Sequence, residues 1–236
     1  MSPPRHAEQA QRIREMFGRI ANRYDLMNRL MTFGQDMRWR RFVVSQTALP
    51  SGGRLLDLAI GTGDIALAAL QRHPGLTVVG VDFSLPMMQV GRQRRLGDAV
   101  LWCQGDALAL PFPENTFDAV VSGYLLRNLV DLRQGLQEQV RVVRPGGMVV
   151  ALDTTPPPHT PLRPLIIFHL RRVIPLLGRL VTGEPDAYAY LPDSTQAFKP
   201  PQELAAELRG VGLQDVTFRT FMLGTMAVHW GRKPVP

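Results

Sequence analysis

The sequence predicts an α/β fold built on a mainly parallel, doubly wound sheet. From residue 54 onward, short apolar runs rich in β-formers alternate with helical stretches. The runs are too short for core helices and have the composition of buried parallel strands. The first of them, "LLDLAIGTGD" at 55–64, ends in a glycine loop. Such alternation requires crossovers that place helices on both faces of the sheet.

The first 50 residues precede this alternation and are expected to form a helical N-terminal segment. Apolar side chains recur at helical spacing from Ile13 to Met31, and Gly34 ends that stretch. A further helix is expected in "QDMRWRRFVVSQTAL", before the turn residues at 50–53.

Residues 51–153 are expected to form the core that holds the cofactor. Strands are predicted at 54–60, 76–83, 99–106, 117–126 and 148–153, with helices at 64–73, 84–97 and 132–143 between them.

Residues 154–200 interrupt this pattern and are expected to form an inserted helical cap. A proline-rich stretch leads into the apolar run "IIFHLRRVIPLLGRLV". Arg171 and Arg172 lie at its centre and Pro175 should break it, so a membrane span is not predicted. Residues 201–236 return to a helix and two strands, which completes one domain over 1–236.

The 236 residues carry a net charge of +7, and Lys199 and Lys233 are the only lysines. Arginine pairs well with phosphate, so nucleic acid is one interpretation. The arginines are dispersed and form no basic tail, which favours a solvated surface with some attraction to anionic lipid and no nucleic-acid partner. One cysteine, Cys103, and the absence of a signal-peptide pattern predict a reducing cytoplasm.

The glycine loop is compatible with two cofactors. Gly61, Gly63 and Ala66 satisfy the loose dinucleotide fingerprint, and the glycines let the backbone approach a ligand. Asp82, 19 residues after Gly63 at the end of the second strand, is placed to meet ribose hydroxyls. NAD and S-adenosylmethionine (SAM) fit these residues equally well.

The acids around the loop favour SAM. Asp57 and Asp64 flank it, and carboxylates repel a pyrophosphate but attract a sulfonium and an ammonium group. Asp106 and Ala107 follow the third strand, where a carboxylate accepts a hydrogen bond from the adenine amino group. A capping aspartate is the structural alternative for Asp106. We therefore expect SAM in this loop and no metal.

The motifs "LLDLAIGTGD", "GVDFS", "GDALALPFPENTFDAVV" and "VRPGG" resemble class I SAM-dependent methyltransferases. More specific stretches resemble the ubiquinone/menaquinone biosynthesis C-methyltransferase family over about residues 13–234: "YDLMNRLMTFGQDMRWRR", "LLRNLVDLRQGL", "PLLGRLVTGEPDAYAYLPDSTQAF" and "MAVHWGRKP". Members of that family methylate a ring carbon of a polyprenylated benzoquinol or naphthoquinol.

The resemblance implies cofactor roles for Thr62, Asp82, Asp106 and Ala107. The sequence departs from the family at three places. Ile60 stands where the family has glycine or cysteine, Gly123 where it has a cofactor-binding serine, and Tyr124-Leu125 where it has Phe-Gly.

Methylation of a quinol carbon needs a base and a positive group beside the developing phenolate. Arg127, at the carboxyl edge after the fourth strand, is the first candidate for the positive group; a salt-bridged structural arginine is the alternative. Asn128 orients Arg127 or caps a turn. Tyr24 bonds the quinol oxygen or belongs to the core.

No metal-ligand spacing relates the five histidines, His6, His73, His159, His169 and His229. His229 is a weak candidate for the base and is otherwise structural. Residues 162–181, with the methionines and aromatics of 16–42, suit an isoprenoid chain.

The leading hypothesis is a cytoplasmic quinol C-methyltransferase, peripheral at the inner membrane face, converting demethylmenaquinol to menaquinol or acting on the ubiquinone-pathway benzoquinol. A methyltransferase with another small acceptor and a non-catalytic SAM-binding subunit of a quinone-biosynthesis complex are alternatives, and an NAD oxidoreductase is disfavoured. Homo-oligomerisation or membership of such a complex is open.

Overall fold

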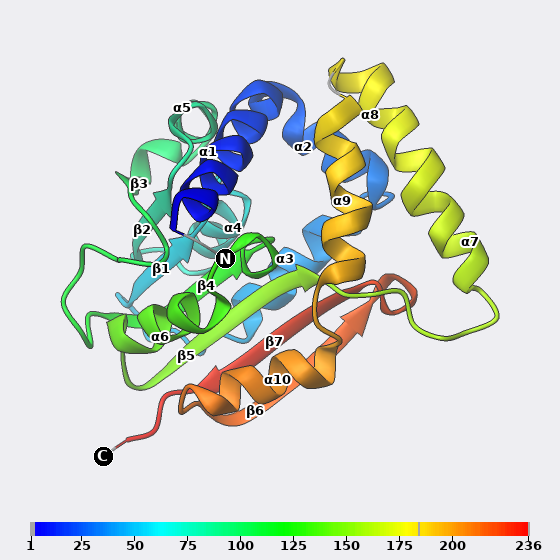
Figure 1. Ribbon diagram of the computed structural model, residues 1–236. Helices are drawn as coiled ribbons and strands as arrows, with labels where there is room; N and C mark the ends of the chain where they lie inside the picture. The colour runs from blue at the N-terminus through cyan, green and yellow to red at the C-terminus, as the bar shows by residue number, and fades with distance from the viewer. Residues whose placement is uncertain (1–2, 184, 236) are drawn as a thin grey trace.

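The computed structural model describes residues 3–183 and 185–235. At its centre lies a seven-stranded sheet in the order β3-β2-β1-β4-β5-β7-β6 (Figure 1). The first five strands pair in parallel, and β7 is antiparallel to both β5 and β6. The fold class expected from the sequence is confirmed. The strands are β1 (Arg54–Leu58), β2 (Thr77–Asp82), β3 (Val100–Gln104), β4 (Phe117–Gly123), β5 (Val143–Thr154), β6 (Gln214–Phe221) and β7 (Met226–Arg232).

The central strands are buried because helices cover both faces of the sheet. Four of the five residues of β1 are buried, as its apolar run predicts. One face packs against α3 (Asp36–Ser45), α4 (Asp64–Arg72) and α5 (Leu85–Arg92). The other packs against α6 (Leu132–Val142) and α10 (Pro201–Gly210). Each face thus has its own apolar core, and the carboxyl ends of the parallel strands remain open for a ligand.

A third, smaller apolar core lies away from the sheet, between the N-terminal helices and the cap. It is formed by α1 (Pro3–Ile20), α2 (Tyr24–Met31), α7 (Arg163–Phe168), α8 (Ile174–Thr182) and α9 (Pro185–Ala197). Figure 1 shows α7 and α8 as an outer arm, with α9 between that arm and the rest of the molecule. The cap therefore has its own interior.

Pro175 does not break the helix of the cap, contrary to the expectation from the sequence. Residues His169–Val173 form a π-helical turn that joins α7 directly to α8, and Pro175 lies in the first turn of α8. A proline lacks the N–H that a continuing α-helix would use, and a widened turn accommodates that loss. In the described part of the chain, no helix combines the length and hydropathy needed to cross a bilayer.

Candidate active site

The glycine loop lies between the end of β1 and the start of α4, at the carboxyl edge of the sheet. It borders a small pocket of about 60 Å³, which we call the loop pocket. Four of the residues expected to bind the cofactor line it: Asp57, Gly61, Thr62 and Asp82. The backbone of the loop is sharply turned, with φ of +57° at Gly61 and +88° at Gly63, where glycine is favoured.

Asp82 is held rigidly by backbone donors. The N–H of Gly61 donates to its Oδ2 at 2.8 Å, and the N–H of Ser84 donates to its Oδ1 at 2.7 Å. Burial nevertheless raises the pKa of Asp82 to about 6, because no cationic side chain offsets the loss of water. An oriented carboxylate of this kind suits a ligand that donates neutral hydroxyl groups.

Among the acids of the loop pocket, Asp57 has the pKa that burial raises most. Its Oδ2 accepts a hydrogen bond from the N–H of Ala66 at 3.0 Å, and burial raises its pKa to about 8. Among the described residues, no cationic side chain lies within ion-pair distance of it. A buried carboxylate beside a ligand pocket is stabilised by a ligand cation. This charge pattern fits the ammonium and sulfonium groups of SAM.

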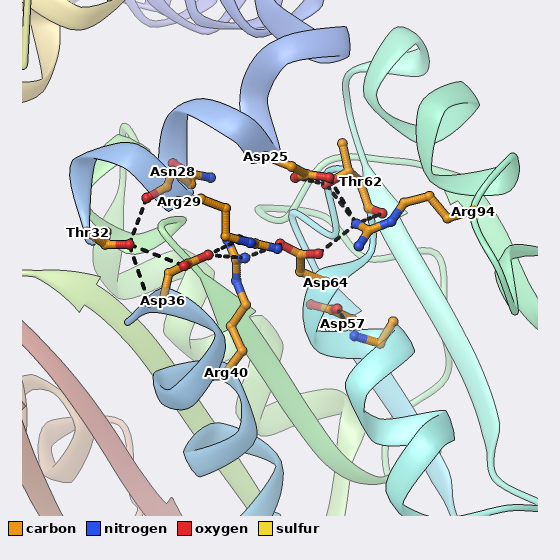
Figure 2. A network of polar contacts seen from close by, with 11 residues as sticks. Asp25, Asn28, Arg29, Thr32, Asp36, Arg40, Asp57, Thr62, Asp64 and Arg94 are labelled. Atoms are coloured by element: carbon orange, nitrogen blue, oxygen red, sulfur yellow. Dashed lines mark hydrogen bonds and ion pairs between the residues drawn. The ribbon is translucent and has the colours of Figure 1, made fainter. Parts of the chain in front are cut away.

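Asp64 does not play the part expected of it from the sequence. Figure 2 shows its carboxylate between three guanidinium groups, those of Arg29, Arg40 and Arg94. Burial opposes ionisation of Asp64, but the three arginines together outweigh it and lower the pKa of the carboxyl group. Its charge is therefore neutralised by the protein, and of the two flanking acids only Asp57 remains to attract a cationic ligand.

The same arginines join the N-terminal segment to the loop. Asp36 pairs with Arg40 at 2.8 Å and also with Arg29 (Figure 2). On the other side of the loop, the Thr62 hydroxyl donates to Asp25 Oδ1 at 2.6 Å, and Arg94 Nη1 lies 3.1 Å from Asp25 Oδ2. The network holds α2 over the glycine loop.

A second, wider pocket of about 790 Å³ adjoins the loop pocket and shares Ala59, Asp82 and Phe83 with it. Asp106 and Ala107 line this pocket, as expected for residues that meet an adenine ring. Asp106 is exposed and accepts a hydrogen bond from the N–H of Leu108 at 2.9 Å, so it also stabilises its own turn. Asp82 therefore lies where the two pockets meet.

Two glycine-loop residues have packing roles that the sequence did not reveal. Gly63 lines neither pocket; a Cβ there would lie 3.0 Å from the Trp102 ring. The bulky Ile60 extends over Gly80 of β2, where an added Cβ would lie 2.1 Å from Ile60 Cδ1. The glycine in β2 thus makes room for the isoleucine that departs from the family pattern.

Next to the loop pocket lies a chamber of about 650 Å³ between the N-terminal helices and the cap. Most of its lining is apolar. Phe17, Tyr24 and Tyr124 line both the chamber and the loop pocket, so they form the boundary between them. No aspartate or glutamate is among the described lining residues of the chamber. A donor in the loop pocket would therefore meet an acceptor in the chamber across this aromatic boundary.

Arg127 lines the chamber and is held from behind by Asp153 at the end of β5. Its Nη1 lies 2.5 Å from Asp153 Oδ1, and its guanidinium lies over the ring of Tyr124, 5.3 Å from the centroid. Burial disfavours the charged guanidinium, but Asp153 outweighs that effect and raises the pKa of Arg127. Its buried Nε–H has no hydrogen-bond partner in the described structure. Arg127 is thus salt-bridged, as the alternative interpretation held, and it also lines the chamber.

The two boundary tyrosines remain protonated at neutral pH. Burial raises the pKa of Tyr24, and the positive charges of Arg40 and Arg127 offset this only in part. Burial raises the pKa of Tyr124 as well. Tyr124 also has φ of +61°, a conformation that is costly for a bulky residue and that places its ring between the two cavities.

For two polar residues, the contacts fit the structural role that the sequence left open. Asn128 does not line the chamber; its amide donates to the carbonyl oxygen of Tyr124 at 2.9 Å, which stabilises the turn that carries Arg127. His229 lies inside β7, 1% exposed, with its Nε2 2.9 Å from the carbonyl oxygen of Pro201. It does not reach the chamber, and burial lowers its pKa. These contacts fit the structural alternative for His229.

Sequence reasoning missed Asp153, Thr195 and Tyr188. Asp153 could have been found from the sequence, because it lies at the end of β5 and Arg127 follows the end of β4. These strands are parallel neighbours, so their carboxyl ends lie side by side. Thr195 donates to Thr154 at 3.0 Å inside the chamber, and the Tyr188 hydroxyl is buried without a described partner. These two come from the inserted cap and had no local signal.

Comparisons with known proteins agree with this geometry. Residues 5–233 match the model of the ubiE/COQ5 methyltransferase family. The chain belongs to that family. The ubiquinone/menaquinone biosynthesis C-methyltransferase UbiE of Desulfotalea psychrophila is 49% identical, over 94% of this chain and 90% of that protein. The demethylmenaquinone methyltransferase of Thermus thermophilus is 43% identical, over 93% of this chain and all of that protein.

The family assignment makes the chain a SAM-dependent methyltransferase, and the resemblance of its motifs to the quinone methyltransferases is confirmed. Solved structures show the same fold at low identity. A SAM-dependent methyltransferase from Thermotoga maritima superposes with a TM-score of 0.64 at 20% identity, over 94% of this chain and 99% of that one. The enzyme alternative based on NAD is thereby set aside.

Proposed function

We propose that this methyltransferase transfers a methyl group to a ring carbon of a polyprenyl quinol, converting demethylmenaquinol to menaquinol, with the ubiquinone-pathway benzoquinol as the second candidate acceptor. The chamber carries the proposal. It is apolar, large enough for a quinol ring with the start of an isoprenoid chain, and separated from the loop pocket only by aromatic side chains. Naphthoquinol is favoured because several relatives, among them that of Roseiflexus castenholzii, are named demethylmenaquinone methyltransferases.

Different residues hold the different chemical groups of SAM. Asp57 takes the ammonium group, because its buried carboxylate has no ion-pair partner among the described residues. Asp82 accepts from the ribose hydroxyls, and Asp106 with Ala107 holds the adenine. The backbone at Gly61, Thr62 and Gly63 shapes the loop without side-chain bulk. Bound SAM supplies an electrophilic methyl group and carries its own leaving group.

Arg127 acts on the acceptor. Transfer of a proton from a quinol hydroxyl to water raises electron density on the neighbouring ring carbon, and a guanidinium beside the oxygen favours that anion. The carbon takes the methyl group and then releases its own proton to water, which restores the aromatic ring. Arg127 lines the chamber, so its charge lies near the oxygen of a ring bound there, and Asp153 fixes the orientation of the guanidinium. Tyr24, protonated and at the boundary, donates to the same oxygen or orients the ring. The apolar walls exclude water and so strengthen both interactions.

The proposal extends to the location of the enzyme and to the organisation of its chain. The enzyme acts in the cytoplasm, peripheral at the inner membrane face, because its acceptor partitions into the bilayer. The division into a helical segment at 1–50, a core at 51–153, a cap at 154–200 and a C-terminal unit at 201–236 is our functional reading of one domain. A homo-oligomer or a quinone-biosynthesis complex remains compatible with it.

The test is methyl transfer from labelled SAM to short-chain demethylmenaquinol and to the corresponding benzoquinol, under anaerobic conditions. The expected product is a naphthoquinol heavier by one methylene unit, with the label on the ring carbon. Methylation of neither ring by a protein that binds SAM would favour a different acceptor or a non-catalytic subunit. Rescue of transfer by a partner protein would support the latter.

A further inference from the structure

The mouth of the chamber is ringed by apolar side chains that face solvent. Phe33, Leu165, Phe168 and Leu223 line the chamber and yet are between 57% and 74% exposed. They come from the turn after α2, from α7 and from the turn before β7. Exposed bulky residues at a cavity mouth mark an interaction surface.

The outer face of the cap continues this rim along one helical stripe. From Leu165, exposed residues recur at helical spacing through Phe168, Arg172 and Leu176 to Arg179 and Leu180. The inner face of the same helix faces the chamber core with Ile166, Leu170 and Ile174. The helix is therefore apolar on both sides, and Figure 1 shows this arm at the outer edge of the molecule.

The charge of this arm has one sign. Residues 154–183 contain four arginines and no aspartate or glutamate. All four arginines, at 163, 171, 172 and 179, are exposed. Bulky apolar residues mixed with arginines and free of acids are typical of a surface that lies in the headgroup region of an anionic bilayer.

We propose that the outer face of α7 and α8, together with the rim of Phe33, Leu165, Phe168 and Leu223, docks on an anionic phospholipid bilayer and opens the chamber directly into it. The proposal rests on the proposed function, because a polyprenyl quinol resides in the bilayer. Leu176 and Leu180 enter the headgroup boundary, and Arg172 and Arg179 lie against lipid phosphates. The quinol ring enters past the rim while its chain remains in the hydrocarbon.

The test measures co-sedimentation with vesicles of phosphatidylcholine and phosphatidylglycerol in equal parts, and with vesicles of phosphatidylcholine alone. The wild-type protein should bind the mixed vesicles and release them in high salt. Arg172→Gln/Arg179→Gln should weaken that binding about 25-fold, from about fivefold per arginine near an anionic surface. Leu176→Ser/Leu180→Ser should weaken it about tenfold or more, through lost apolar burial.

The matched controls are Arg72→Gln/Arg133→Gln, two exposed arginines of α4 and α6, and Leu101→Ser, an exposed leucine on the edge strand β3. The controls should bind vesicles as the wild type does. None of the substituted residues lines the loop pocket or the chamber, so every variant should methylate a water-soluble short-chain quinol at the wild-type rate. Transfer to a long-chain quinol in vesicles should fall only in the two cap variants.

Wild-type protein that ignores the mixed vesicles, or cap variants that bind them like the controls, would overturn the docking surface. If short-chain transfer is intact in that case, the proposed function stands. Vesicle binding without methylation of any quinol would support the surface and overturn the function. A dimer in sedimentation equilibrium that Leu176→Ser/Leu180→Ser dissociates, without vesicle binding, would assign this face to a second copy of the chain and overturn the proposal.

Discussion

The ion pair of Arg127 with Asp153 makes it possible to separate catalysis from stability. Asp153 is 1% exposed and accepts from Arg127 Nη1 at 2.5 Å. Arg127→Ala leaves this buried carboxylate without its cation, and removal of one partner of a buried pair costs about 3–5 kcal/mol. A single alanine variant would therefore lose stability whatever the catalytic role of the arginine.

The double variant Arg127→Gln/Asp153→Asn removes both charges and retains side chains able to hydrogen bond. Its free energy of unfolding should fall by only about 1–2 kcal/mol, because no unpaired charge remains buried. Turnover should still fall by about 10²-fold or more, equivalent to about 2.7 kcal/mol of oxyanion stabilisation. SAM affinity should be unchanged, since Arg127 lines the chamber and not the loop pocket.

Urea denaturation gives the stabilities, calorimetry gives the SAM affinity, and single-turnover transfer at saturating quinol gives the rate. Asp153→Asn alone serves as the control, because it retains the guanidinium. Wild-type turnover in the double variant, alongside a stability higher than that of Arg127→Ala, would refute the reasoning and make Arg127 purely structural. So would a loss of SAM affinity in proportion to activity.

Four further outcomes concern the glycine loop and the residues that hold it. Asp82→Ala should weaken SAM binding by about 1.5–3 kcal/mol, because it removes a buried charged acceptor; calorimetry measures this, and an unchanged affinity would show that Asp82 only braces the loop. Because the pKa of Asp57 is raised to about 8, binding of the SAM cation at pH 7 should release a proton from this carboxyl group. For the same reason, the affinity for SAM should rise as the pH increases towards 8. Both effects should vanish in Asp57→Asn. The raised pKa contributes stability below about pH 4 that is lost as pH rises through 8, so Asp57→Asn should stabilise the ligand-free protein at pH 9 by about 1–3 kcal/mol in chemical denaturation. Asp25→Ala should loosen the contact of α2 with the glycine loop. Protease cleavage within residues 20–31 should then be faster than in the wild type, while the core remains folded. A cleavage rate equal to that of the wild type would refute the bracing role of Asp25.

The sheet and the glycine loop were predictable because their signals are local. Short apolar runs, turn glycines and an acid at a strand end lie within a few residues of one another in "LLDLAIGTGD". Adjacent parallel strands then bring Asp57 and Asp82 to the same edge with no further information. The same rule predicted that Arg127, which follows β4, lies at this edge of the sheet.

What the sequence did not reveal depends on partners that only the tertiary structure brings together. Asp64 flanks the loop as expected, yet arginines 24, 30 and 35 residues away neutralise it. His229 lies in a stretch that resembles the family, but nothing in that stretch predicted that its ring packs against α10 and β6. Pro175 predicted a break in the helix, but the π-helical turn before it keeps the helix continuous. Such a turn has no sequence signature of its own.

The proposed chemistry requires a ring carbon that becomes nucleophilic by reduction and deprotonation of the ring. The direct measurement compares transfer from labelled SAM to short-chain demethylmenaquinone with and without excess dithionite, under anaerobic conditions. An oxidised ring is electron-poor, so the account predicts label in the product only when the acceptor is reduced, at a rate that falls in Arg127→Gln/Asp153→Asn. Equal rates with oxidised and reduced acceptor would contradict the mechanism, whatever the family of the protein.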